Sequence, residues 1–259
     1  MNLTDSFVLK CQLGAPVLYK DICAIYPATL RKIVTKGYDS FQKYLSVIMT
    51  EKPVLKDSPP EMKEIMKNLT DFTFFLLMTS LDADFAVEAK QAFRFFINEN
   101  VIFSLEPAQI IVGPLEEKHI INEEDFYEFR RIIKRMYLLE QEGEEIIISE
   151  EDSPRLKALK KQMRENRQKL AKAKAKKKSQ EKSDIKFSDL VGSVALAVPG
   201  LNMINIWDLT YYAFHDQLTR MGWKEKYEMN SRAALAGAKI KKSELSYWLK
   251  SMQNSDDSN

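Results

Sequence analysis

The chain of 259 residues contains little histidine and little cysteine, with two of each. His119 and His215 lie outside any HExxH pattern, and neither has a cysteine at the spacing of a metal site. Cys11 and Cys23 are too few for a disulfide framework, and their spacing is not that of a redox or metal pair. The sequence therefore predicts no metal site, no cofactor and a reduced, cytoplasmic setting.

Catalytic sequence patterns are also lacking. The chain has only 8 glycines, and it contains neither a glycine-rich phosphate loop nor a GxSxG nucleophile motif. Asp208 and Asp216 are near one face of an expected helix, but capping and solvated charge explain such carboxylates more often than catalysis does. We therefore expect a protein that is not an enzyme.

Long apolar runs are missing as well. The longest, from Phe72 to Met78 with Thr73 inside it, is far shorter than the roughly 20 residues that span a bilayer. Residues 1–20 have no cationic region followed by a long apolar one, so they do not form a signal-peptide pattern. The sequence predicts no membrane partner.

Charge is present, but it is distributed unevenly around a net value of only +2. Residues 116–152 hold 13 acidic residues against 5 Lys or Arg, whereas residues 155–182 hold 13 Lys or Arg against 2 Glu. Such blocks of like charge are typical of exposed segments between domains. We therefore place a charged helical linker at 141–186, acidic at first and then basic.

Residues 1–140 are predicted to form a mainly α domain with a few small strands, in the α+β class. Apolar residues at helical spacing dominate it, as in the stripe of Phe126, Phe129, Ile133 and Met136. Either Asp82 or Asp84 is expected to cap the start of one helix, Asn122 the start of another, and Gly37 the end of a third. Short β-like runs interrupt the helices at 7–9, 17–19, 22–26, 101–103, 110–112 and 119–121.

The linker helix is expected to begin at Ser153-Pro154, with an apolar seam from Leu156 to Leu170. The seam covers about two heptads, which leaves self-association open. Its other faces are basic and include Arg155, Lys160, Lys161, Arg164, Arg167, Lys176, Lys177 and Lys178. A solvated connector or a protein contact is favoured over nucleic-acid binding, because the segment has no aromatic residues to stack on bases. The alternative is a nucleic-acid-binding accessory protein with a steep salt dependence.

Residues 187–251 are predicted to form a small all-α domain, followed by a polar, disordered tail at 252–259. A short helix is expected to end at Pro199-Gly200. A long helix follows, with Asn202 or Asn205 as its N-cap and Gly222 at its end. Further helices are expected over 224–236 and from Ser243.

The long helix carries a dense stripe of aromatic residues. A helix this apolar usually buries its face, so core packing explains most of the stripe. A domain of this size cannot bury every aromatic side chain, and we expect Tyr211, Tyr212 and Trp223 to stay exposed for a protein partner. The predicted partner-binding residues are Trp207, Tyr211, Tyr212, Asp216, Trp223 and Arg232.

Two parts of the chain resemble the tail assembly chaperones of long-tailed bacteriophages. One is IYPATLRKIVTKGYDSFQKYLSVI, from Ile25 to Ile48. The other comprises NIWDLTYYAFHDQ, from Asn205 to Gln217, then NSRAALAGA, from Asn230 to Ala238, and a basic segment that ends at Trp248. The resemblance touches both predicted domains and leaves the basic linker unmatched.

The resemblance implies a specific function. Tail assembly chaperones coat the aggregation-prone tape-measure protein through an N-terminal domain and recruit tail-tube subunits through a C-terminal domain. They act in the host bacterial cytoplasm and are absent from the finished virion. We therefore expect a chaperone whose partners are the tape-measure protein and the tail-tube protein. A structural tail or connector component is a further alternative.

Overall fold

The fold was taken from a computed structural model, which describes residues 5–53, 64, 68–113, 118–139, 185–241 and 245. The chain forms two compact units. The first comprises Met1–Leu139 and Gly200–Thr219, and the second comprises Glu140–Pro199 and Arg220–Asn259. The division therefore falls inside the long helix α10 (Tyr211–Leu235).

The first unit begins with helix α1 (Asp5–Leu13), where a strand was predicted over 7–9. The prediction was wrong because these apolar residues follow a helical period. Phe7 and Val8 pack against the core four and three positions before the fully buried Cys11. Gly14, with φ of 81°, ends the helix, and its amide N–H donates to the Lys10 carbonyl at 2.9 Å.

Two short strands follow the first helix, as the sequence predicted. β1 (Val17–Tyr19) pairs antiparallel with β2 (Cys23–Ile25). Residues 26–29 then leave the sheet, and the Tyr26 amide N–H donates to the Phe96 carbonyl at 2.8 Å. This extended stretch becomes the attachment point for a distant part of the chain.

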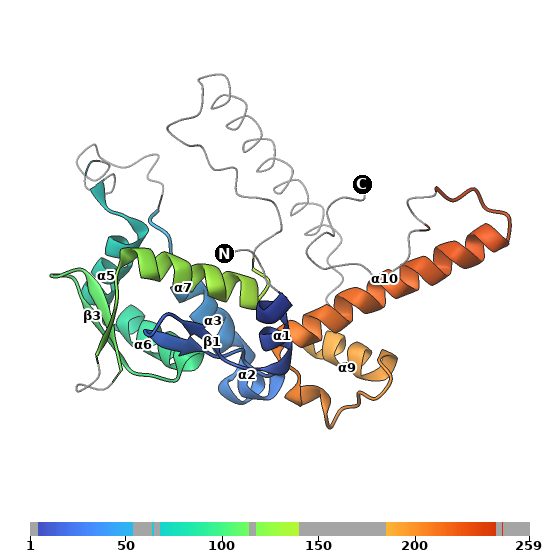
Figure 1. The fold of residues 1–259 in the computed structure, drawn as a ribbon, viewed down its shortest axis with the longest axis horizontal. Coiled ribbons are helices and arrows are strands. Elements are labelled where there is room, and N and C mark those ends of the chain that lie inside the picture. The colour runs from blue at the N-terminus through green and yellow to red at the C-terminus, as the bar shows by residue number, and fades with distance from the viewer. Residues whose placement is uncertain are drawn as a thin grey trace, which may run out of the picture. The chain divides into compact units, whose positions relative to one another are not determined.

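The body of the first unit is helical, with α6 at its centre (Figure 1). α6 packs against α3, α5, β2 and the strand β3 (Val101–Ser104), and α7 packs against α5 and the strand β5 (His119–Ile121). These helices are α2 (Leu30–Lys36), α3 (Tyr38–Ile48), α5 (Asp71–Leu81), α6 (Ala83–Ile97) and α7 (Glu123–Met136). Side-chain caps start α6 at Asp82 and α7 at Asn122, and Gly37 caps the end of α2, which confirms the predicted caps.

A three-stranded antiparallel sheet lies beside these helices, in the order β3, β4, β5. Its strands are β3 (Val101–Ser104), β4 (Gln109–Val112) and β5 (His119–Ile121), as the sequence predicted. Successive side chains of a strand point to opposite faces. Val101, Ile110, Val112 and Ile121 are buried, so one face of the sheet closes the helical core.

Phenylalanine rings fill the core between the sheet and the helices. The Phe93 and Phe129 rings are stacked, with centroids 5.1 Å apart, and the Phe75 and Phe126 centroids are also 5.1 Å apart. Aromatic side chains bury large areas and fix the relative orientation of the elements that carry them. This packing joins α5, α6 and α7 into one core.

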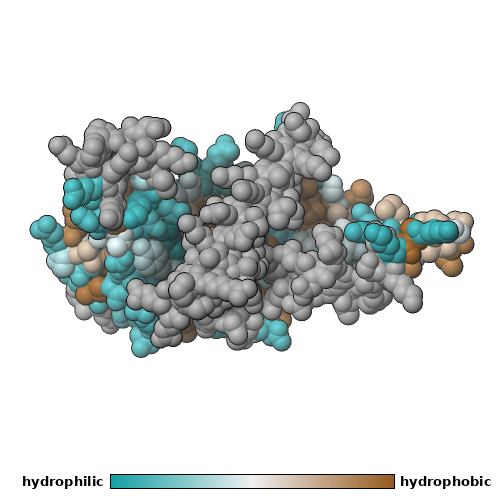
Figure 2. All heavy atoms as spheres, turned by 90° about the horizontal axis from the view of Figure 1, so that it is seen from above, coloured by the Kyte–Doolittle hydropathy of each residue, from teal (hydrophilic) through white to brown (hydrophobic). Residues whose placement is uncertain are grey.

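The second unit is described for α9 (Phe187–Ala197) and for α10 from Arg220 onward. The predicted end of the long helix at Gly222 was wrong, since α10 continues to Leu235. A single helical glycine costs only about 1 kcal/mol relative to alanine, and good helix formers surround Gly222. Along this part of α10 hydrophobic and hydrophilic residues are mixed (Figure 2), and Met229 and Leu235 are exposed among charged side chains.

The structure confirms the predicted class, which is mainly α with a few small strands and a helical C-terminal region. It differs from the predicted domain limits, because residues 200–219 belong to the unit formed by 1–139 and not to a separate domain over 187–251. Among the described helices, none combines the length and the hydropathy that crossing a bilayer requires.

Candidate functional site

A single antiparallel bridge ties residues 209–211 to residues 28–30. The Leu30 amide N–H donates to the Leu209 carbonyl at 2.8 Å, and the Tyr211 amide N–H donates to the Ala28 carbonyl at 2.9 Å. The bridge is centred on Thr29 and Thr210. Backbone hydrogen bonds across a gap of about 180 residues therefore place the 200–219 segment on the N-terminal fold.

Thr210 is the best-connected residue of this bridge, and it is buried. Its hydroxyl donates to the Cys11 carbonyl at 2.7 Å and accepts from the Ala213 amide N–H at 3.0 Å. A hydroxyl has one donor and two acceptor sites, so Thr210 can cap the start of α10 and bind α1 at the same time. The predicted N-cap at Asn202 or Asn205 was therefore wrong.

Tyr211 and Tyr212 follow Thr210 and pack into the first unit. The Tyr211 ring lies 5.5 Å from the Phe41 ring and 5.7 Å from the Tyr137 ring, between centroids. Burial raises the pKa of Tyr211 to about 12. Tyr212 is only 5% exposed and belongs to the core. The expectation that Tyr212 stays exposed was wrong, and Tyr211 is largely covered.

His215 and Asp216 lie on the next turn of α10. The centroids of the His215 and Tyr211 rings are 4.3 Å apart. Burial lowers the pKa of His215 to about 4, so the imidazole is neutral at pH 7. Asp216 is buried and accepts a hydrogen bond from the Gln12 side-chain amide at 3.2 Å. Asp216, a predicted partner-binding residue, thus helps to hold α10 on α1.

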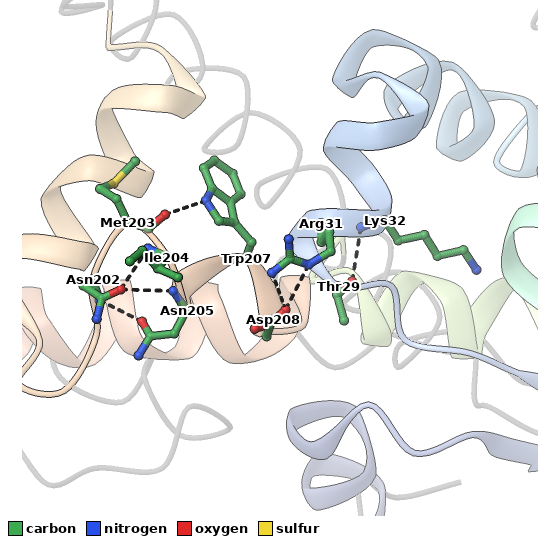
Figure 3. A network of polar contacts seen from close by, with 9 residues as sticks. All are labelled: Thr29, Arg31, Lys32, Asn202, Met203, Ile204, Asn205, Trp207 and Asp208. Atoms are coloured by element: carbon green, nitrogen blue, oxygen red, sulfur yellow. Dashed lines mark hydrogen bonds and ion pairs between the residues drawn. The ribbon is translucent and has the colours of Figure 1, made fainter.

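The residues before η1 (Ile206–Asp208) form a loop that its own asparagines hold together (Figure 3). The Asn202 side-chain carbonyl accepts from the amides of Ile204, at 2.8 Å, and Asn205, at 3.1 Å. In return, the Asn205 side chain accepts from the Asn202 amide and donates to the Gly200 carbonyl, both at 2.8 Å. These bonds satisfy backbone groups that would otherwise need water, so the loop has a defined shape without regular secondary structure.

This loop and the first two residues of η1, together residues 202–207, present apolar side chains to solvent. Met203 is 55% exposed and Ile204 is 82% exposed. Trp207 is half-buried, and its indole N–H donates to the Met203 carbonyl at 2.8 Å (Figure 3). An aromatic anchor beside exposed aliphatic residues is typical of protein-binding surfaces. We refer to residues 202–207 as the Asn-braced loop.

An exposed ion pair holds the end of the Asn-braced loop against α2. Both Nε and Nη2 of Arg31 donate to one carboxylate oxygen of Asp208, at 3.0 and 2.7 Å (Figure 3). Next to it, the Lys32 ammonium group donates to the Phe95 carbonyl at 2.7 Å. Burial lowers the pKa of Lys32. Asp208 therefore serves as a docking residue, and among the residues that the structure describes it pairs with Arg31 and with no carboxylate.

Two predicted partner-binding residues lie elsewhere. Trp223 and Arg232 are on the part of α10 that belongs to the second unit, where Arg232 forms an ion pair with Glu228 at 3.6 Å. Trp223 is half-buried. The basic residues predicted for the linker lie outside the described residues, namely Arg155, Lys160, Lys161, Arg164, Arg167, Lys176, Lys177 and Lys178.

Three residues of the site, Met203, Ile204 and Thr210, were not among those predicted from the sequence. A signal for the loop was present, because two asparagines three residues apart flank an apolar pair, and asparagine side chains favour local turns. A signal for Thr210 was also present, since a threonine directly before an aromatic helical run is a typical N-cap. The aromatic stripe led us to predict a helix start at Asn202 or Asn205, whereas α10 begins at Tyr211.

Residues 175–253 match a family model described as the YomV second domain. YomV is a phage-related protein family, so the match suggests a phage protein. The matched range contains the segments 205–217 and 230–238. No curated protein and no solved structure matches the chain.

Proposed function

We propose that this chain is a bacteriophage tail assembly chaperone. In this proposal it keeps the tape-measure protein soluble and recruits tail-tube subunits in the host bacterial cytoplasm, and it is absent from the mature virion. The match to a phage-related family over residues 175–253 supports a phage origin. The chaperone function rests on the sequence resemblance together with the arrangement of the segments that carry it.

One observation carries the proposal. Two of the segments that resemble chaperones, 25–48 and 205–217, lie far apart in the sequence but meet in the first unit. Their contact is a set of specific bonds, which includes the Ala28–Tyr211 and Leu30–Leu209 backbone pairs. Both segments resemble tail assembly chaperones, and they fold onto each other. A structure shared with those chaperones explains this better than two unrelated coincidences in sequence do.

The Asn-braced loop is the proposed contact for tail-tube subunits. Its aliphatic side chains are exposed while its backbone is already hydrogen-bonded, so binding would order few groups. The Arg31–Asp208 ion pair holds the loop to α2. The helices of the first unit are the proposed cover for the tape-measure protein.

Co-expression tests the chaperone activity. The chain is produced in bacteria with the tape-measure protein encoded near its gene, and the soluble fraction of the tape-measure protein is measured with and without the chain. A clear rise in that fraction is expected. Unchanged insolubility would rule out the proposed activity. The presence of the chain in purified virions would instead favour a structural tail component.

A pull-down tests the role of the Asn-braced loop. Full-length chain carrying Ile204→Asp should lose tail-tube subunits, because a carboxylate placed in an apolar contact must be desolvated. The same variant should keep its effect on the tape-measure protein. Leu81→Asp is the matched control, since Leu81 is also strongly exposed in the first unit but lies at the end of α5. Equal retention of tube subunits by wild type and Ile204→Asp would remove the loop from the proposal.

A further inference from the structure

The outer face of the three-stranded sheet carries a row of three isoleucines. Strand register aligns Ile102 of β3 with Ile111 of β4, and Ile111 with Ile120 of β5. Their neighbours along the strands, such as Ile110 and Ile121, are buried, so alternation directs the three aligned side chains away from the core. Ile102 is 52% exposed and Ile120 is 50% exposed. We call these three residues the isoleucine row.

We propose that the isoleucine row binds an amphipathic α-helix of another protein, one with a narrow aliphatic stripe and an acidic residue beside it. Scattered exposed apolar residues are normal on protein surfaces, but a continuous row on adjacent strands is a contiguous patch. The proposal does not depend on the chaperone function, because it rests on the register, exposure and surroundings of the row.

The dimensions of the row fit a helix. Adjacent strands lie about 4.8 Å apart, so three aligned side chains span about 10 Å. Seven residues of an α-helix rise about 10.5 Å, which is the distance over which an i, i+3 or i+4, i+7 stripe repeats. A helix laid along the row can therefore place one aliphatic residue over each isoleucine.

The surroundings of the row define the chemistry of the ligand. On one side Ser104 pairs with Gln109, and on the other the Gly113 amide N–H donates to the Asn100 carbonyl. The stripe is therefore narrow, with polar positions on both sides. Lys118 lies directly before β5, two positions ahead of Ile120, and it is the one charged residue among these flanking positions. An acidic residue next to the aliphatic stripe would complement it.

Other occupants fit the sheet less well. A specific interface between two copies buries about 800 Å² on each partner, which is far more than one row of three isoleucines can provide. Addition of a strand at a sheet edge would be limited by the length of the edge strands, because β3 has four residues and β5 has three. A helix that crosses the strands uses the face and needs no free edge.

Binding is tested with fluorescein-labelled designed helical peptides and full-length protein, by fluorescence anisotropy. One peptide carries a leucine stripe flanked by glutamate, and the other carries the same stripe flanked by lysine. The glutamate peptide should bind the wild type more tightly, and Lys118→Gln should reduce that preference. Equal affinities for both peptides would contradict the predicted ligand chemistry.

Ile102→Thr combined with Ile120→Thr should weaken binding of the glutamate peptide about tenfold, because it removes aliphatic contact and keeps β-branched side chains in the strands. Leu18→Thr, on the exposed side of β1, is the matched control and should bind as the wild type does. Unchanged affinity in the double variant would overturn the proposal. If the double variant fails to fold, the proposal is tested instead with Ile120→p-benzoylphenylalanine in the otherwise wild-type chain. Photo-cross-linking to the peptide is expected at this position, and its absence would also overturn the proposal.

Discussion

The Thr210 hydroxyl donates a 2.7 Å hydrogen bond to the Cys11 carbonyl, although 198 residues separate the two in the chain. The same hydroxyl accepts the Ala213 amide N–H and so begins α10. One small side chain thereby joins the end of α1 to the start of the longest described helix. The Asn-braced loop lies shortly before Thr210 in the chain. Its position therefore follows from this attachment.

Replacing Thr210 by valine should destabilise the first unit by about 2 kcal/mol. The substitution keeps the shape of the side chain but leaves the Cys11 carbonyl and the Ala213 amide without their partner. Urea unfolding followed by circular dichroism measures the change. Thr210→Ser retains the hydroxyl and should lose less than half as much. Equal losses in the two variants would show that the methyl group, and not the hydrogen bonds, matters.

Gly14→Ala should also destabilise the protein, by about 1 to 2 kcal/mol. Gly14 has φ of 81°, and an added Cβ would lie 3.3 Å from the Thr210 methyl carbon. Gly192→Ala is the control, because Gly192 is inside α9 and a Cβ there would meet nothing within 4 Å. The control should be neutral or slightly stabilising, since alanine favours a helix. Thermal unfolding of both variants checks the prediction, which a stabilised Gly14→Ala would contradict.

His215 should make the fold sensitive to mild acid. Its pKa is about 4 in the folded state and about 6.5 when the ring is exposed, so protonation favours the unfolded chain. The stability linked to His215 is therefore complete above pH 6.5, falls as the pH drops and levels off near pH 4, a loss of about 3 kcal/mol. His215→Phe keeps an aromatic ring beside Tyr211 and should remove this part of the dependence. Urea unfolding of both proteins from pH 7.5 to 4 measures the difference, and parallel curves would contradict the prediction.

Asp125 should stabilise the folded chain as a buried carboxylate with a lowered pKa. Burial alone would raise its pKa, but hydrogen bonds from Lys20, from the Tyr19 hydroxyl and from the Asn122 backbone outweigh burial and lower the pKa below its usual value. Its stabilising effect is present above the ordinary carboxyl pKa and is lost as the pH falls through the lowered value. Asp125→Asn should therefore cost about 1 to 3 kcal/mol at pH 7 and progressively less in acid, below the ordinary carboxyl pKa. The exposed Asp84→Asn serves as a control in the same unfolding series, and an equal loss for Asp125→Asn at both pH values would refute the assignment.

The Arg31–Asp208 pair should add little to stability. Both side chains are more than half exposed, and exposed ion pairs contribute about 0 to 1 kcal/mol. Asp208→Asn should thus leave the unfolding midpoint nearly unchanged, while increasing the mobility of the Asn-braced loop in hydrogen exchange. A large loss of stability would contradict this prediction. It would show that the ion pair, more than the Thr29–Thr210 backbone bridge, attaches residues 200–219 to the N-terminal fold.

Much of the first unit could be predicted from local patterns. Caps such as Asp82 and Asn122, and the alternation in β3, β4 and β5, depend on residues a few positions apart. Besides the N-cap of α10, two other local predictions were wrong. The apolar run at 7–9 is too short to distinguish a strand from a helix turn, and Gly222 is too weak a breaker to end α10.

The candidate site could be predicted only in part. The aromatic composition of 207–223 predicted partner contacts in this part of the chain, but the exposure of each ring depends on neighbours that lie far away in the sequence. Tyr212 is buried because the N-terminal core surrounds it, and Ile204 is exposed because the Asn-braced loop turns it outward. Partner binding by Trp207, Trp223 and Arg232 stays a prediction.

The sequence by itself determined the helical class, the short strands and the residues able to cap helices, because each depends on spacing within one or two turns of chain. Tertiary structure alone decided that residues 200–219 join the N-terminal unit. That choice depends on the Thr29–Thr210 bridge and on the Thr210–Cys11 hydrogen bond, which pair groups nearly 200 residues apart. No local period encodes such a pairing, because backbone donors and acceptors are the same in every residue and only the folded core brings these particular ones together.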